Sequence, residues 1–145
     1  MATIKRIEDK PLIHQFSTNV FPRFLWVVKD VSIEWIKERF ENADGDALAD
    51  MDNAKAVTYP EIIHKETGKY GILVAIPDSE DMTLSDCAHE ALHFAMELGR
   101  AIDFLLDYDN QEIFAYLTGF ATDAIYQVVT DKYKPMLSDG NKTFE

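Results

Sequence analysis

The chain has 145 residues, of which 47% are hydrophobic and 12% aromatic. This length fits a single domain spanning residues 1–145, and this composition is sufficient to bury a core. The 26 acidic and 14 basic residues give a net charge of -12. Such a charge argues against nucleic acid and an anionic membrane surface as partners, because both require a basic protein surface.

The sequence carries no targeting signal that we recognise. Its N-terminus is interrupted by Glu8, Asp9 and Lys10, and it contains no run of 18 apolar residues. The single cysteine, Cys87, excludes an intrachain disulfide and is best interpreted as a small buried hydrophobic residue. We therefore expect a cytoplasmic protein without a membrane-spanning helix, whose oligomeric state the sequence does not set.

The first half of the chain favours strands. Residues 1–20 are mixed and end in a turn-rich cluster, and the aromatic, β-branched residues that follow predict a strand over 23–29. A short helix comes next, carrying Ile33, Ile36 and Phe40 at helical spacing. Residues 41–53 contain five acidic residues and no basic one, which indicates a solvated loop or a frayed helix end.

A β-hairpin and two helices make up the rest. Strands are predicted over 55–63 and 70–76 with a turn at 65–68. A helix capped by Thr83 follows and could end at Gly99, and residues 100–108 are ambiguous between helix and connection. A last helix, capped by residue 109 or 110, is predicted to run to about Thr130, and the tail from Lys132 is expected to be frayed. The order β-α-β-β-α-α predicts an α+β fold in which a small mixed or antiparallel sheet of about three strands packs on helices.

The residues His89-Glu90-Ala91-Leu92-His93 form an HExxH motif inside the first long helix. Positions i and i+4 lie on one helical face, so both imidazoles can reach one metal ion. Glu90 projects from a neighbouring angle, where it can take a proton from a metal-bound water. The alternative is a surface histidine pair that binds no metal.

A catalytic zinc ion needs a third protein ligand. Glu112 comes 19 residues after His93, early in the last predicted helix, which a connection of this length can return beside the first. Gly119 on the same helical face as Glu112 would let the two helices approach closely. The downstream candidates are Asp103, Asp107, Asp109, Glu112 and Asp123.

The motif HEALH followed by NQEIFAY (110–116) resembles the gluzincin clan of zinc peptidases, most of all the single-domain minigluzincins and small HExxH proteins of bacteriophages and prophages. This resemblance covers about 85–130, with a looser match through the strands. It implies a zincin-like fold, one Zn²⁺ held by His89, His93 and Glu112, and Glu90 as general base. Gln111 would support a ligand histidine. Tyr116 stands where those enzymes carry an aspartate, and a neutral phenol raises the basicity of a ligand histidine less.

The functional hypothesis is zinc-dependent hydrolysis of a peptide or protein substrate, which can add as a strand to the sheet edge near the motif. One alternative is a non-catalytic zinc-binding interaction module of a phage or prophage system. Another is a zymogen-like state in which residues 1–20 or the tail cover the metal. Tyr116, Tyr108 or Tyr126 could donate to an oxyanion, and so could His14 or His64, which are otherwise expected to be solvated.

Overall fold

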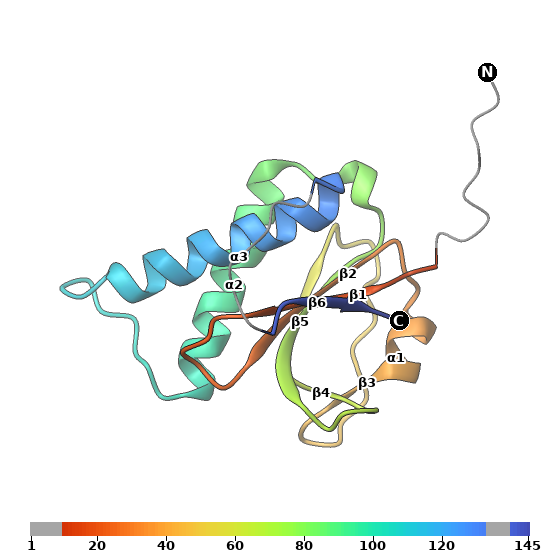
Figure 1. The fold of residues 1–145 in the computed structure, drawn as a ribbon, viewed down its shortest axis with the longest axis horizontal. Coiled ribbons are helices and arrows are strands. Elements are labelled where there is room, and N and C mark those ends of the chain that lie inside the picture. The colour runs from red at the N-terminus through yellow and green to blue at the C-terminus, as the bar shows by residue number, and fades with distance from the viewer. Residues whose placement is uncertain (1–9, 133–139) are drawn as a thin grey trace.

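In residues 10–132 and 140–145, which the computed structural model describes, six strands form one mixed sheet with two long helices across one face (Figure 1). The elements in chain order are β1 (Ile13–Ser17), β2 (Phe24–Lys29), α1 (Ile33–Arg39), β3 (Phe40–Asn42), β4 (Val57–His64), β5 (Tyr70–Ile76), the 3-10 helix η1 (Ser79–Asp81), α2 (Leu84–Ala101), α3 (Glu112–Thr130) and β6 (Lys142–Phe144). The strand order is β3-β4-β5-β2-β1-β6. Strands β2 and β5 run parallel, and the other neighbouring pairs are antiparallel.

The central strands β2 and β5 are apolar on both faces, as strands covered on both sides must be. In β2, Leu25 and Val27 face one core cluster, whereas Trp26 and Val28 face the other. This alternation follows from the two-residue period of a strand. Gly71 of β5 leaves room for the indole ring, because a Cβ at this position would lie 2.6 Å from Cζ3 of Trp26.

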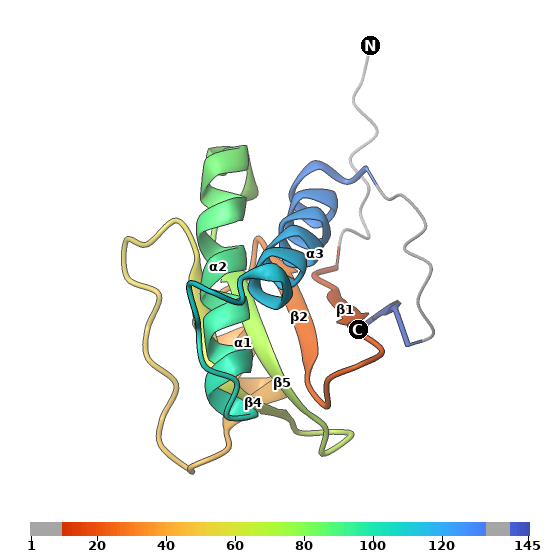
Figure 2. The same cartoon turned by 90° about the vertical axis from the view of Figure 1, so that its left-hand side faces the viewer.

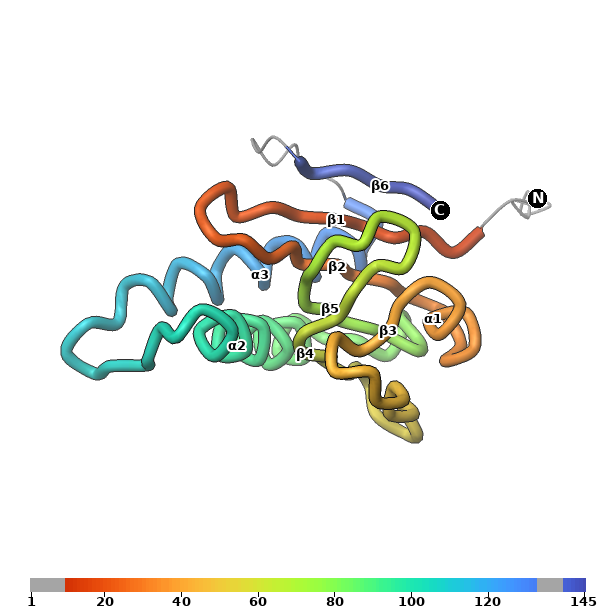
Figure 3. Tube along the Cα trace, turned by 90° about the horizontal axis from the view of Figure 1, so that it is seen from below, coloured from red at the N-terminus to blue at the C-terminus, as the bar shows by residue number. Residues whose placement is uncertain are grey.

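The helices are divided between the two faces of the sheet. Helices α2 and α3 cover the Leu25 and Val27 face, and Figure 2 shows them side by side over the strands. Helix α1 lies on the opposite side of the sheet (Figure 3), where Ile36 packs with Leu48 and Met51 from the connection between β3 and β4. No helix within the described ranges has the length and apolar character needed to cross a membrane.

Small residues bring α2 close to α3. Ala91, Ala95 and Gly99 repeat every four residues along the buried side of α2, and a Cβ at Gly99 would lie 3.0 Å from the Phe114 ring of α3. Gly99, where the helix could have ended, lies inside it, because α2 continues to Ala101. The prediction that Gly119 permits close approach is also wrong, since no atom lies within 4 Å of its Cβ position.

The predicted α+β class, the strand at 23–29, the hairpin and the two long helices are confirmed. The prediction of about three strands is wrong, because β1, β3 and β6 extend the sheet at its two edges. The prediction of a frayed tail is wrong at Lys142–Phe144, which pairs with β1. The other parts of the tail and of the N-terminal segment, residues 133–139 and 1–9, lie outside the described residues.

Candidate metal centre

A reciprocal cap fixes the start of α2, one turn before the HExxH motif. Oγ1 of Thr83 accepts a hydrogen bond from the Asp86 N–H at 3.2 Å, and Oδ2 of Asp86 accepts one from the Thr83 N–H at 2.9 Å. This capping box confirms the predicted N-cap. The hydrogen bond from the Thr83 backbone also lowers the pKa of the Asp86 carboxyl. The motif therefore lies on a helix whose register is set by its own first turn.

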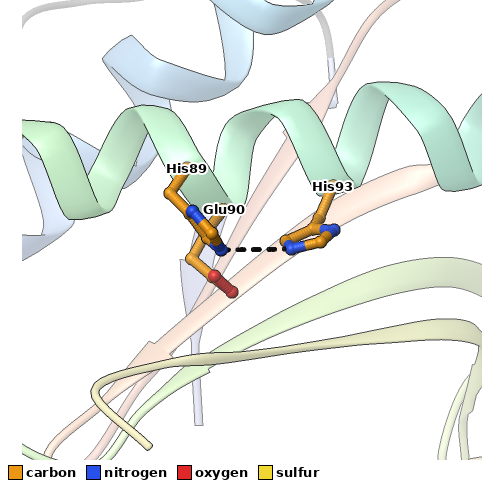
Figure 4. Close-up of side chains that lie close together, drawn as sticks. All are labelled: His89, Glu90 and His93. Atoms are coloured by element: carbon orange, nitrogen blue, oxygen red, sulfur yellow. Dashed lines mark hydrogen bonds between the residues drawn. The ribbon is translucent and has the colours of Figure 1, made fainter.

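The two histidines of the motif meet on the exposed side of α2 (Figure 4). Nε2 of His89 and Nε2 of His93 are 3.2 Å apart, and the ring centroids are 4.9 Å apart. Two nitrogen ligands of a tetrahedral zinc ion, each at about 2.05 Å from the metal, are separated by about 3.3 Å. The two ring nitrogens are thus at hydrogen-bonding distance, which is also close to the separation of two nitrogen ligands of one zinc ion, and solvent can reach them.

Glu90 is buried beside the exposed histidines. It is 5% exposed, and Oε1 accepts a hydrogen bond at 3.2 Å from the Thr58 hydroxyl of β4. Burial raises the pKa of the Glu90 carboxyl, while His93 and the Thr58 hydrogen bond oppose this shift. A carboxylate in this setting is a stronger base than one in water, and its hydrogen bond holds it between the helix and the sheet.

A small pocket lies beside this group, between α2 and the residues that lead into β4. Its volume is about 200 Å³, and it is lined by Lys55, Ala56, Asp86, His89 and Glu90. The Lys55 ammonium lies 3.3 Å from Oδ2 of Asp86, which joins the connection before β4 to the first turn of α2. A ligand at the histidines would therefore have this pocket beside it.

Three side chains are brought together as possible metal ligands. The ligand atoms of His89, Glu90 and His93 all lie within 4.8 Å of one another, and no other such group occurs in the described part of the chain. Glu112 is not in it. The Glu112 side chain is exposed at the first residue of α3, and the histidines project from the side of α2 away from the Ala91-Gly99 line that packs on α3.

The two residues predicted to support the site, Gln111 and Tyr116, lie at the start of α3. Gln111 is the N-cap residue of α3 and makes no side-chain capping hydrogen bond. Tyr116, on the same helix, is 76% exposed. The group of possible metal ligands therefore consists of residues from α2 alone, and Glu112 at the start of α3 is outside it.

The other candidates are placed away from solvent or away from the motif. His14 and His64 are buried, so the expectation that they are solvated is wrong. Both have a threonine hydroxyl as partner. Nδ1 of His64 is 2.9 Å from Oγ1 of Thr67, three residues further along the chain, and Nδ1 of His14 is 3.1 Å from Oγ1 of Thr143 of β6. Cys87 is buried as predicted, and burial raises its thiol pKa to about 11, so it stays protonated at neutral pH.

Sequence reasoning did not find Thr58 and Lys55, which approach the motif from a distant part of the chain. Thr58 is 32 residues from Glu90, and Lys55 is 31 residues from Asp86. The one available signal was a polar threonine between two hydrophobic residues, Val57 and Tyr59, at the start of β4. Comparison with known proteins adds no residue to the site, because no family model, curated protein or solved structure matches the chain.

Proposed function

We propose that the protein is a zinc-dependent hydrolase that cleaves peptide bonds, with His89 and His93 as metal ligands and Glu90 as general base. One observation carries the proposal. Two exposed imidazole nitrogens lie at the separation that a tetrahedral ion requires, and a buried carboxylate lies within 4.8 Å of them. A surface histidine pair that binds no metal does not require the glutamate beside it to be buried and hydrogen-bonded, as Glu90 is.

The donor set fits zinc, since neutral imidazoles are among its usual ligands in catalytic sites. When bound there, the ion would supply a water acidified to near-neutral pKa and would polarise a carbonyl group. Zinc is therefore the cofactor we propose, at one ion per chain.

In this proposal, Glu90 accepts the proton of the attacking water and passes it to the leaving amine nitrogen. Its raised pKa suits this task, because a carboxylate with ordinary acidity is a weak base at neutral pH. The Thr58 hydroxyl leaves the second carboxylate oxygen available, since its hydrogen bond goes to Oε1. The buried position keeps the side chain in one orientation.

An extended peptide is the substrate that the neighbouring sheet edge suits. Strand β3 pairs with β4 only at Ile62–His64, so among the described residues no strand covers the outer edge at Val57–Tyr59. This edge includes Thr58, which touches Glu90. A peptide that pairs with this edge would pass beside the HExxH motif.

The third protein ligand is the open part of the proposal. The gluzincin resemblance favours Glu112, but the described geometry leaves it outside the group. We therefore base the centre on His89 and His93 and treat Glu112 as a separate prediction.

The test is cleavage of a fluorogenic library of unstructured peptides by zinc-loaded protein. We expect Glu90→Gln to lower turnover by about 10²–10⁴-fold while zinc content, measured by mass spectrometry, is retained. Glu97→Gln is the matched control, because Glu97 lies on the same helix but outside the group. Equal activity in Glu90→Gln and the wild type would rule out this mechanism.

A non-catalytic zinc-binding module is the second candidate. The observation that favours it is the small donor set, since the described structure joins only two histidines and one buried base. In that case the wild-type protein takes up one zinc ion and its melting temperature rises, yet no peptide of the library is cleaved. The same samples thus separate the two functions.

A further inference from the structure

The connection between α2 and α3 holds three large hydrophobic side chains in water. Leu105, Leu106 and Tyr108 are 83%, 54% and 86% exposed. The connection forms the projecting left-hand end of the molecule in Figure 1. Single exposed hydrophobic residues are ordinary on protein surfaces, whereas neighbouring exposed hydrophobic residues with a polar rim are typical of a site of interaction.

The loop that carries these side chains is held to both helices through Phe104 and contains a hydrogen-bonded turn of its own. The Phe104 N–H donates to the Gly99 carbonyl at 2.7 Å, and the Phe104 ring packs on Phe114 with centroids 5.8 Å apart. The Asn110 N–H donates to the Asp107 carbonyl at 3.1 Å and closes a turn that includes Tyr108. A surface that is already ordered loses less conformational entropy when it binds.

The surroundings of the three side chains are acidic. Four exposed carboxylates occur within ten residues of the chain: Asp103, Asp107, Asp109 and Glu112. The nearest basic residue in sequence, Arg100, already pairs with Glu97 at 3.3 Å. A second copy of this chain would bring the same carboxylates face to face, and an anionic lipid surface would be repelled. The complementary partner is both apolar and basic.

We propose that residues 103–112, the loop surface, dock a basic amphipathic helix of another protein. Leucine-like side chains of that helix would cover Leu105 and Leu106, while its lysines or arginines meet the carboxylates. The Tyr108 ring offers a face to a cation, and tyrosine is over-represented among residues that dominate binding. This inference does not depend on the proposed hydrolase activity, because it uses neither histidine of the motif.

The probe is a fluorescein-labelled 14-residue helix of leucine and lysine in an amphipathic pattern, titrated with full-length protein and followed by anisotropy. We expect saturable binding that weakens as salt is added, since the contacts include ion pairs. The same peptide with glutamate in place of lysine should not bind. Backbone amide shifts from NMR should change in residues 102–112 and leave β6 unchanged.

Two variants locate the binding. Leu105→Ser combined with Tyr108→Ser should weaken binding about tenfold or more. Asp103→Asn combined with Asp109→Asn should weaken it less and reduce its salt dependence. Val20→Ser is the matched control, because Val20 is 77% exposed but lies in a different turn, and it should leave affinity within about twofold.

Several results would overturn the inference. One is no binding of the lysine peptide up to millimolar protein, and another is equal binding by the glutamate peptide. Unchanged affinity in both loop variants would show that the peptide binds elsewhere on this acidic protein. A doubled mass in light scattering that the Leu105→Ser, Tyr108→Ser variant abolishes would identify the loop surface as a contact between copies instead.

Discussion

The four histidines of the chain form two pairs with opposite surroundings. His89 and His93 are exposed on α2 and face one another with ring nitrogens 3.2 Å apart. His14 of β1 and His64 of β4 are buried within the sheet, each with Nδ1 beside a threonine hydroxyl. The helix pair contacts another imidazole and solvent, whereas the sheet pair is enclosed by the core.

This difference decides which histidines can bind a metal. A ligand nitrogen needs an accessible lone pair, and in a buried ring that has a hydroxyl partner the nitrogen is neither free nor reachable. Burial lowers the pKa of both His14 and His64, so both are neutral at pH 7 and suit a packed interior. The same residue type therefore serves structure in the sheet and remains available for chemistry on the helix.

The largest effect we expect is on zinc affinity, which should fall when a histidine of α2 is replaced and stay nearly unchanged when a buried histidine of the sheet is replaced. His93→Ala should lower zinc affinity by more than about 100-fold, since even outer partners of metal ligands are worth 10–100-fold. His64→Gln removes a buried histidine and should leave affinity within about threefold. Isothermal titration of zinc into each variant measures both. Equal losses in the two variants would mean that zinc binds outside the α2 pair.

Of the buried histidines, His14 should make the free energy of unfolding depend on pH in the acid range. Burial is the main cause that lowers the pKa of His14, to about 4, and the Lys29 charge adds to it. The folded state then binds fewer protons than the unfolded state between about pH 6.5 and 4, so this contribution to stability is lost as pH falls through that window. At about 1.36 kcal/mol per pKa unit, the loss approaches roughly 3 kcal/mol.

The measurement is urea unfolding at pH 7 and at pH 4.5 for the wild type and His14→Gln, whose amide does not titrate. We expect the free energy of unfolding to fall by roughly 2 kcal/mol more in the wild type than in the variant over this interval. Parallel losses in both proteins would show that His14 is not a source of acid sensitivity.

The close contact between α2 and α3 at Gly99 can be tested by substituting two glycines, one inside the contact and one outside it. Gly99→Ala would place a Cβ 2.6 Å from the Phe104 carbonyl oxygen, and we expect it to cost roughly 1–3 kcal/mol of stability. Gly119→Ala meets no atom within 4 Å on an exposed part of α3, and it should stabilise by about 0.5–1 kcal/mol. Urea unfolding of the two variants with the same sign of change would contradict the described contact.

The features that were predicted correctly are those that nearby residues determine. Each of them depends only on residues of a single helix or strand. Examples are the spacing of His89 and His93, the Thr83 cap, and the apolar runs of β2 and β5. The missed strands depend on distant partners. Gln15, a polar residue, is buried in β1 because it accepts from the Trp26 indole at 3.0 Å and donates to the Gly140 carbonyl at 3.0 Å. No pattern within β1 or β6 reveals such contacts.

Contacts between distant parts of the chain, which the sequence does not reveal, matter most for the role of Glu112. Its proposed role requires a particular crossing of α2 and α3, which neither helix encodes alone. Because Glu112 is exposed at the start of α3 and outside the histidine group, we expect Glu112→Ala to change zinc affinity by less than about threefold. Glu97→Ala on α2 is the control for loss of one negative charge.

A loss of zinc affinity in Glu112→Ala as large as that in His93→Ala would give the opposite answer. It would mean that zinc binding draws the start of α3 toward the histidines and completes a His-His-Glu site. Amide shifts recorded with and without zinc distinguish the cases. Changes confined to α2 and β4 support the two-histidine centre, whereas changes at residues 111–116 show that the helices rearrange around the ion.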